Sequence, residues 1–129
     1  MPEQGKWRLT VRSDFAAAHS LRNYGGACEA LHGHNFAVSM TVEGDRLAQE
    51  TELLVDFKEL KRLLAAVLDE LDHKFLNAIE PFATRNPSSE NLARHIYRHL
   101  KPGIAVLGVR LTEVTVSEKP AQSAAYSEY

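Results

Sequence analysis

The sequence has 129 residues and a mass of 14.4 kDa, typical of one domain with one hydrophobic core, so we expect a single domain over residues 1–129. Its 44% hydrophobic and 25% charged residues exclude a wholly disordered chain, and its net charge of −2 indicates neither a nucleic-acid-binding nor a membrane-surface protein. Because the chain has no apolar run of about 20 residues, no secretion signal at its start and only one cysteine, we expect a soluble protein of the reducing cytoplasm.

Two strands are predicted in the first third of the chain, where apolar residues recur at every second position. The alternation covers Trp7 to Phe15 and again Phe36 to Val42. Between them, the segment from Ser20 to Leu31 contains the pair Gly25–Gly26, which breaks regular structure and predicts a loop. If the two strands pair through this loop, the end of the first lies beside the start of the second.

Helical spacing replaces this alternation in the middle of the chain. Asp56 stands three residues before Glu59 in a capping-box pattern, and apolar residues then recur at helical spacing as far as Leu71, so that the first helix is predicted to end at about residues 71–73. A second helix is predicted to begin near residues 86–88 and to end at the pair Pro102–Gly103.

The last part of the chain returns to the spacing of strands. Alternating residues predict one strand over 109–118 and a shorter one over 124–126. The order strand, strand, helix, helix, strand, strand (ββααββ) predicts the α+β class, with a four-stranded antiparallel sheet and two helices on one of its faces.

Three histidines are positioned to converge at one end of this predicted sheet. His32 and His34 begin the second strand and point to the same face, because residues i and i+2 of a strand share a face. His19 ends the first strand on the parity of its inward residues. Three imidazoles with a vacant fourth position are typical of a catalytic zinc site. If Cys28 supplied a fourth ligand, the same residues would form a closed structural site.

Cys28 and the pair Asp72–His73 are the candidate acid–base groups. Cys28 lies in the glycine-containing loop beside the predicted metal, where a neighbouring cation favours the reactive thiolate. The alternative interpretation is that this cysteine is only a small, buried apolar side chain. A carboxylate that orients an imidazole, as Asp72 could orient His73, is a common acid–base arrangement. The alternative is a histidine that interacts only with the dipole of the preceding helix.

Glu118 and the histidines of the second predicted helix have less specific surroundings. Glu118 has the inward parity of Val114 and Val116, so its carboxylate needs a partner. A lysine or arginine would be the ordinary partner, and a ligand with adjacent N–H donors, such as a guanine-like or pterin ring, would be a functional one. His95 and His99 are interpreted as surface or hydrogen-bonded residues.

Six blocks of the sequence, in order from residue 15 to residue 118, together form the pattern of one known family. They are FAAAH (15–19), CEALHGH (28–34), VDF (55–57), LDHKFLN (71–77), NPSSENLA (86–93) and VTVSE (114–118). This pattern resembles the 6-pyruvoyl tetrahydropterin synthase / 6-carboxytetrahydropterin synthase superfamily, and the resemblance covers nearly the whole chain.

The resemblance implies a tunnelling fold, in which several subunits join their sheets into a barrel, usually as a homohexamer built from two trimers. Ser88 and Ser89 match positions beside the pterin that family members often fill with threonine, and Lys119 stands where threonine is common. The further roles implied by the resemblance are zinc binding by His19, His32 and His34, proton abstraction by the thiolate of Cys28, proton relay by Asp72 and His73, and pterin anchoring by Glu118.

The substrate implied by the resemblance is 7,8-dihydroneopterin triphosphate, on which two zinc-dependent lyase reactions compete. Three residues separate Cys28 from His32, which resembles the bacterial enzymes of queuosine biosynthesis that form 6-carboxy-5,6,7,8-tetrahydropterin and release acetaldehyde and triphosphate. Animal-type enzymes that form the 6-pyruvoyl product usually have five. We therefore expect the carboxy-forming reaction, with pyruvoyl formation as the alternative and a non-catalytic zinc- or pterin-binding protein as a more remote one.

Overall fold

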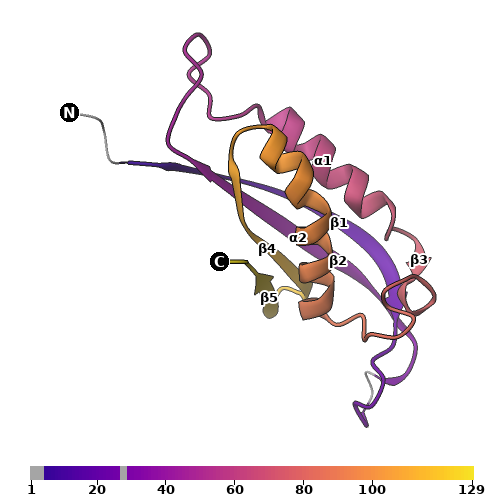
Figure 1. The fold of residues 1–129 in the computed structure, drawn as a ribbon. Helices are drawn as coiled ribbons and strands as arrows, with labels where there is room; N and C mark the ends of the chain where they lie inside the picture. The colour runs from indigo at the N-terminus through magenta and orange to yellow at the C-terminus, as the bar shows by residue number, and fades with distance from the viewer. Residues whose placement is uncertain (1–4, 27–28) are drawn as a thin grey trace.

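The computed structural model describes residues 5–26 and 29–129. Five strands of this part of the chain form one sheet in the order β3-β1-β2-β4-β5, and both helices cover the same face of it (Figure 1). The predicted α+β class is confirmed. The elements in chain order are β1 (Trp7–His19), β2 (His32–Gly44), α1 (Phe57–Asp69), β3 (Lys74–Phe75), the short 3-10 helix η2 (Leu76–Ala78), α2 (Ser89–Val106), β4 (Arg110–Lys119) and β5 (Gln122–Tyr126).

The long hairpin of β1 and β2 is the centre of the sheet. The two strands pair antiparallel over their full length, with His19 opposite His32 and Ala17 opposite His34. Inward residues follow the predicted parities: Phe15 and Phe36, for example, are buried, and their rings stack with centroids 4.9 Å apart. The hydrophobic alternation thus sets the register, because a slip of one residue would turn the apolar side chains to the solvent.

The sheet has one strand more than the four that the sequence predicts. β3 pairs parallel with β1, with Lys74 beside Ala17, and the backbone N–H of His73 donates to the carbonyl of Ala16 (2.6 Å). A strand of two residues has no alternation that could be detected in a sequence. The four longer strands are antiparallel, as predicted.

Both helices begin where the sequence predicts, each at a residue whose side chain accepts a hydrogen bond from the first turn. Asp56 Oδ1 accepts from the backbone N–H of Lys58 (2.9 Å), and Ser88 Oγ accepts from that of Asn91 (3.1 Å). The predicted end of the first helix at residues 71–73 is wrong, because α1 ends at Asp69 and a turn follows.

The predicted end of the second helix at Pro102–Gly103 is also wrong, because α2 continues to Val106. Proline removes one N–H donor from the helix, but the next turn carries Ile104, which is fully buried in the core. Gly103 serves the contact between the helices: a Cβ at this position would lie only 2.9 Å from Cδ2 of Leu63 on α1. The Pro–Gly pair therefore marks a close approach of two helices.

The core lies between the sheet and the two helices. Leu64 on α1 and Ile96 on α2 are fully buried against it. The opposite face of the sheet carries no helix (Figure 1), and β1 exposes Arg12 and Asp14 there. Neither helix of the described residues combines the length and the apolar character that a bilayer crossing requires.

Candidate metal centre and active site

Three histidines and one glutamate meet at the end of the sheet where β1 ends and β2 begins. The Nε2 atoms of His19 and His32 are 3.0 Å apart, and His34 Nε2 lies 3.3 Å from an oxygen of Glu118 on β4. One possible ligand atom from each of the four residues lies within 4.8 Å of the others. The convergence predicted from strand parity is therefore confirmed for the histidines, and the structure adds Glu118 as a fourth possible ligand.

Hydrogen bonds to backbone carbonyls fix which ring nitrogen faces the centre of this cluster. His19 Nδ1 lies 2.8 Å from the carbonyl oxygen of Pro87, and His32 Nδ1 lies 2.7 Å from that of Ala30. A carbonyl oxygen only accepts, so both Nδ1 atoms carry hydrogen and donate. In the neutral rings both Nε2 atoms then carry lone pairs, which is the arrangement of metal-binding histidines with outer-shell acceptors.

These two lone pairs face each other at 3.0 Å, which is unfavourable unless a cation lies between them. Protonation of His19 itself is disfavoured, because this ring is completely buried and desolvation lowers its pKa, although the Pro87 carbonyl and Glu118 act in the opposite direction. A metal ion satisfies both nitrogens. The separation fits as well, since two ligands of a tetrahedral zinc with bonds of about 2.0 Å lie about 3.3 Å apart.

Two asparagines hold the chain in place after His19. The side chain of Asn77 accepts from the backbone N–H of Ser20 and donates to its carbonyl (both 2.9 Å). Asn86 makes the same pair of hydrogen bonds with the backbone of Arg22 (2.8 and 2.9 Å). Neither asparagine has a predicted role, although each stands at the edge of a block that carries the resemblance.

The hollow beside Glu118 has a volume of about 260 Å³. It is lined by Ser88 and Ser89 at the start of α2, by Glu118 itself and by Gln122 and Ser123 at the start of β5. The hydroxyl of Ser89 lies 3.4 Å from an oxygen of Glu118, whose side chain is 17% exposed. The structure therefore brings the predicted ring-anchoring carboxylate and both predicted serines together, next to the histidines.

Asp72 and His73 are in direct contact in the turn after α1. His73 Nδ1 lies 2.9 Å from one oxygen of Asp72, and the other oxygen accepts from the backbone N–H of Ala16 (2.9 Å). The hydrogen bond from Ala16 is the main cause that lowers the pKa of Asp72, followed by the hydrogen bond with His73. The carboxylate is thus kept charged and holds the imidazole in one orientation.

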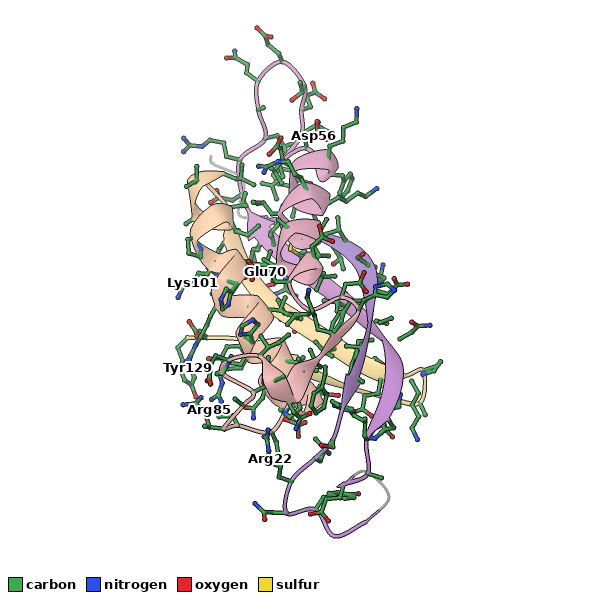
Figure 2. The ribbon with its side chains drawn as sticks, turned by 90° about the vertical axis from the view of Figure 1, so that its right-hand side faces the viewer. Arg22, Asp56, Glu70, Arg85, Lys101 and Tyr129 are labelled. Atoms are coloured by element: carbon green, nitrogen blue, oxygen red, sulfur yellow. The ribbon has the colours of Figure 1, made fainter. Side chains whose placement is uncertain are left out.

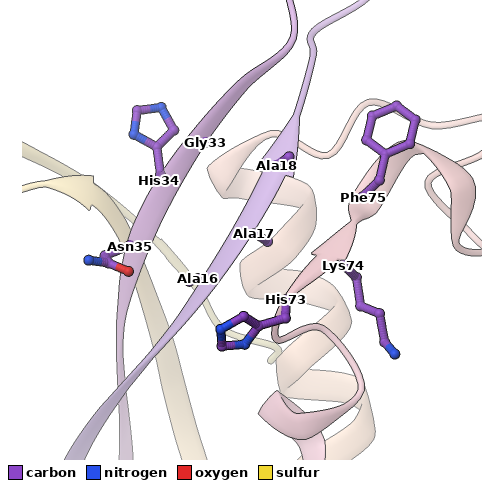
Figure 3. A pocket seen from close by; sticks show the side chains of 9 residues that line it. All are labelled: Ala16, Ala17, Ala18, Gly33, His34, Asn35, His73, Lys74 and Phe75. Atoms are coloured by element: carbon purple, nitrogen blue, oxygen red, sulfur yellow. The ribbon is translucent and has the colours of Figure 1, made fainter.

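The Asp72–His73 pair lies across β1 from the histidine cluster. His73 and His34 nevertheless line the same open depression of about 630 Å³, with Ala16, Ala17 and Ala18 of β1 between them (Figure 3). The side chain of His73 is 83% exposed, so it is free to meet a ligand. The predicted base Cys28 lies outside the described residues.

Comparison with known proteins identifies the family of the chain. The sequence pattern of the family described as 6-pyruvoyl tetrahydropterin synthase matches residues 8–129. The chain belongs to the 6-pyruvoyl tetrahydropterin synthase family. Of the solved structures, it is similar to the 6-pyruvoyl tetrahydropterin synthase of Caenorhabditis elegans, with a TM-score of 0.87 and 26% identity over 100% of both chains. The fold of the single chain that the resemblance implies is thereby confirmed.

Curated relatives within the family carry more than one name. The chain is 36% identical over 112 residues to the 6-carboxy-5,6,7,8-tetrahydropterin synthase of Synechocystis sp., and the matched region covers 84% of each chain. It is 34% identical over 99 residues to the dihydroneopterin monophosphate aldolase of Pyrococcus furiosus, covering 77% of this chain and 79% of that protein. The family is therefore established, and these relatives within it carry different activity names.

Proposed function

We propose that this chain is a 6-carboxy-5,6,7,8-tetrahydropterin synthase that converts 7,8-dihydroneopterin triphosphate to 6-carboxytetrahydropterin, acetaldehyde and triphosphate. The observation that carries the proposal is the pair of Nε2 lone pairs of His19 and His32 that face each other at 3.0 Å beside a hollow with a carboxylate. The similarity to the Synechocystis enzyme of that name supports the choice of reaction.

Zinc is the metal that we assign to His19, His32 and His34, because three imidazoles are a typical donor set of catalytic zinc. Zinc bound there would polarise the oxygen atoms of the substrate side chain and make the adjacent C–H protons more acidic. Glu118 lies at the border between this cluster and the hollow. Its carboxylate is suited to accept hydrogen bonds from adjacent N–H groups of a pterin ring, with Ser88 and Ser89 alongside.

Proton transfer is assigned to three residues. The thiolate of Cys28 removes a carbon-bound proton from the substrate, and His73 holds or returns a proton at its Nε2 atom. Because Asp72 accepts from Nδ1, the imidazole of His73 keeps Nε2 available, and a positive charge on the ring is stabilised during transfer. Asp72 acts through His73 and is a positioning residue.

We also propose that the protein acts as a homo-oligomer, a hexamer of two trimers, whose sheets close into a barrel. The uncovered face of the sheet and its outer strands β3 and β5 support this proposal, since open edges of small sheets are stabilised by pairing (Figure 1). Glu118 lies beside the histidines of its own chain, so this carboxylate does not have to come from another subunit.

Product analysis tests the reaction. Zinc-loaded protein is incubated with 7,8-dihydroneopterin triphosphate, and the pterin products and acetaldehyde are identified by mass spectrometry. We expect 6-carboxytetrahydropterin and acetaldehyde, and no product from the Glu118→Ala variant. A 6-pyruvoyl product would select the alternative lyase, which the similarity to the Caenorhabditis elegans structure supports. Absence of turnover with retained zinc and pterin would favour a non-catalytic binding protein and contradict the proposal.

A further inference from the structure

A second histidine pair lies on α2, outside the site described above. His95 and His99 are one helical turn apart, and their ring centroids are 4.0 Å from each other. They line a pocket of about 290 Å³ between α2 and the segment that precedes it. The residues that line the pocket are Pro81, Phe82, Arg85, Asn91, Arg94, His95, Arg98 and His99.

The pocket is strongly positive. It is lined by three arginines and by no carboxylate. Arg98 forms an ion pair with Glu128 (Nε to Oε2, 3.2 Å) and donates to the hydroxyl of Tyr126 (3.3 Å). The ion pairs found within residues 5–26 and 29–129 include neither Arg85 nor Arg94. Two full positive charges are therefore left without a neutralising partner in that part of the chain.

Hydrogen bonds hold the guanidinium group of Arg94 and the backbone at Arg85. Arg94 Nη2 donates to the side-chain oxygen of Asn91, one turn earlier on α2 (2.8 Å). The backbone at Arg85 is tied down from the other side, because Arg22 donates from Nη1 to the carbonyl of Arg85 (3.0 Å) and from Nη2 to that of Phe82 (2.8 Å). Figure 2 shows Arg22 and Arg85 at the same end of the molecule. A ligand would thus meet a guanidinium group of Arg94 that is already positioned, beside an Arg85 whose backbone is fixed.

The two histidines form one wall of the pocket, and the arginines carry most of its positive charge. His95 packs against the ring of Phe82 (centroids 5.2 Å apart), and burial is the main cause that lowers its pKa to about 4, so it is neutral near pH 7. His99 Nδ1 lies 2.8 Å from the carbonyl of His95 and donates to it, which leaves Nε2 directed elsewhere. Two histidines at this spacing could hold a divalent cation, but the guanidinium groups around this pocket repel such an ion.

We propose that this pocket is an anion site that binds the phosphate groups of a small molecule through the guanidinium groups of Arg85 and Arg94. Guanidinium groups bind phosphate oxygens in pairs of parallel hydrogen bonds, and two unpaired ones on one concavity fit a diphosphate or triphosphate better than a single carboxylate. The concave shape favours a small ligand over an extended polyanion. The inference is independent of the proposed reaction.

Calorimetric titration of the full-length, zinc-loaded protein with inorganic pyrophosphate tests the proposal. The wild type is compared with the Arg85→Gln, Arg94→Gln double variant. The matched control is the Lys61→Gln, Arg62→Gln double variant, which removes the same charge from exposed positions of α1. We expect a binding event that the control keeps and that is about a hundredfold weaker in the pocket variant, about tenfold for each guanidinium removed. Equal binding by all three proteins would overturn the proposal.

A second measurement uses the wild type alone and does not depend on the folding of a variant. Phenylglyoxal modifies accessible guanidinium groups, and peptide mass spectrometry reports which arginines have reacted. Pyrophosphate should slow the modification of Arg85 and Arg94 and leave that of Arg62 unchanged. Equal modification with and without pyrophosphate would overturn the proposal. Zinc titration adds a separate outcome. If the wild type binds additional zinc tightly and the His95→Ala, His99→Ala variant does not, the pocket is a cation site and the proposal is wrong.

Discussion

The two histidine groups of this chain have similar local features and opposite electrostatic surroundings. Each contains a buried or half-buried imidazole whose pKa is lowered mainly by desolvation, His19 in one and His95 in the other. Each contains a ring with Nδ1 directed at a backbone carbonyl. The first group faces the carboxylate of Glu118, and the second is surrounded by guanidinium groups. The sign of the neighbouring charges, and not the histidines themselves, decides between a cation site and an anion site.

The two histidine groups also differ in the elements of the fold that supply their imidazole rings. His19 and His32 come from opposite ends of a long loop and are brought together by strand pairing, so that three ring nitrogens and one carboxylate oxygen converge. His95 and His99 share one helix, and their neighbourhood offers no third ligand of this kind among the described residues. Convergence from several strands gives a metal ion several ligands at once, whereas a single helical turn gives two.

The largest effect is expected when a histidine of the first group is removed. His34→Ala should lose zinc and lower turnover by at least about 10⁴-fold, because the metal and the charge stabilisation that it provides disappear together. His99→Ala in the second group should keep about one zinc per chain. Metal content by plasma emission spectrometry and initial rates check both variants. Full zinc occupancy in His34→Ala would contradict the assignment of the cluster.

The next effect separates chemistry from metal binding within the first group. Cys28→Ala should keep both zinc and bound pterin while turnover falls by about 10³-fold, since only a proton-abstracting base is removed. Zinc content, pterin fluorescence and turnover are measured on the same preparation. Loss of zinc from this variant would support instead the closed structural site with Cys28 as the fourth ligand.

A smaller effect is expected at the positioning residue. Asp72→Asn keeps an oxygen that can accept from the backbone of Ala16, but it no longer stabilises a charged His73, so turnover should fall about 10²-fold with little change in KM. Asp69→Asn, at the exposed end of α1, is the matched control and should retain normal turnover. A change in KM alone would indicate that Asp72 only shapes the depression in which His73 lies.

Much of the fold could be predicted because burial on one face imposes a regular pattern. The parity of Phe15 and Phe36 identified the inward faces of β1 and β2, and Asp56 and Ser88 identified the helix starts. β3 could not be predicted, since its two residues are placed by the turn at His73 rather than by periodicity. The end of α2 was missed because a local Pro–Gly signal competes with the burial of the following turn, and burial decides.

The candidate site was predictable where it follows strand parity. His19, His32 and His34 lie where alternation places them, and so does Glu118. The carbonyl of Pro87, which fixes the tautomer of His19, has no side-chain signature and becomes visible only when the chain is folded. The pocket at His95 was missed for a related reason, since Arg85 reaches it from a separate loop.

The smallest effect concerns stability and the buried ring of the second group. The pKa of His95 is about 4 in the folded chain, against an ordinary 6.5. Between these values the unfolded chain binds a proton that the folded chain does not, so the free energy of unfolding decreases as the pH falls from 6.5 towards 4 and is unaffected above 6.5. Because the ring is only half-buried, solvent screening limits the decrease to about 1 kcal/mol.

Urea unfolding at pH 7 and pH 5 measures this decrease in the wild type and in the His95→Gln variant. Glutamine cannot titrate, so the variant should lose less stability on acidification. The pH dependence of the metal cluster is common to both proteins and cancels in the comparison. An equal loss in both would show that His95 is already protonated or hydrated in the folded chain.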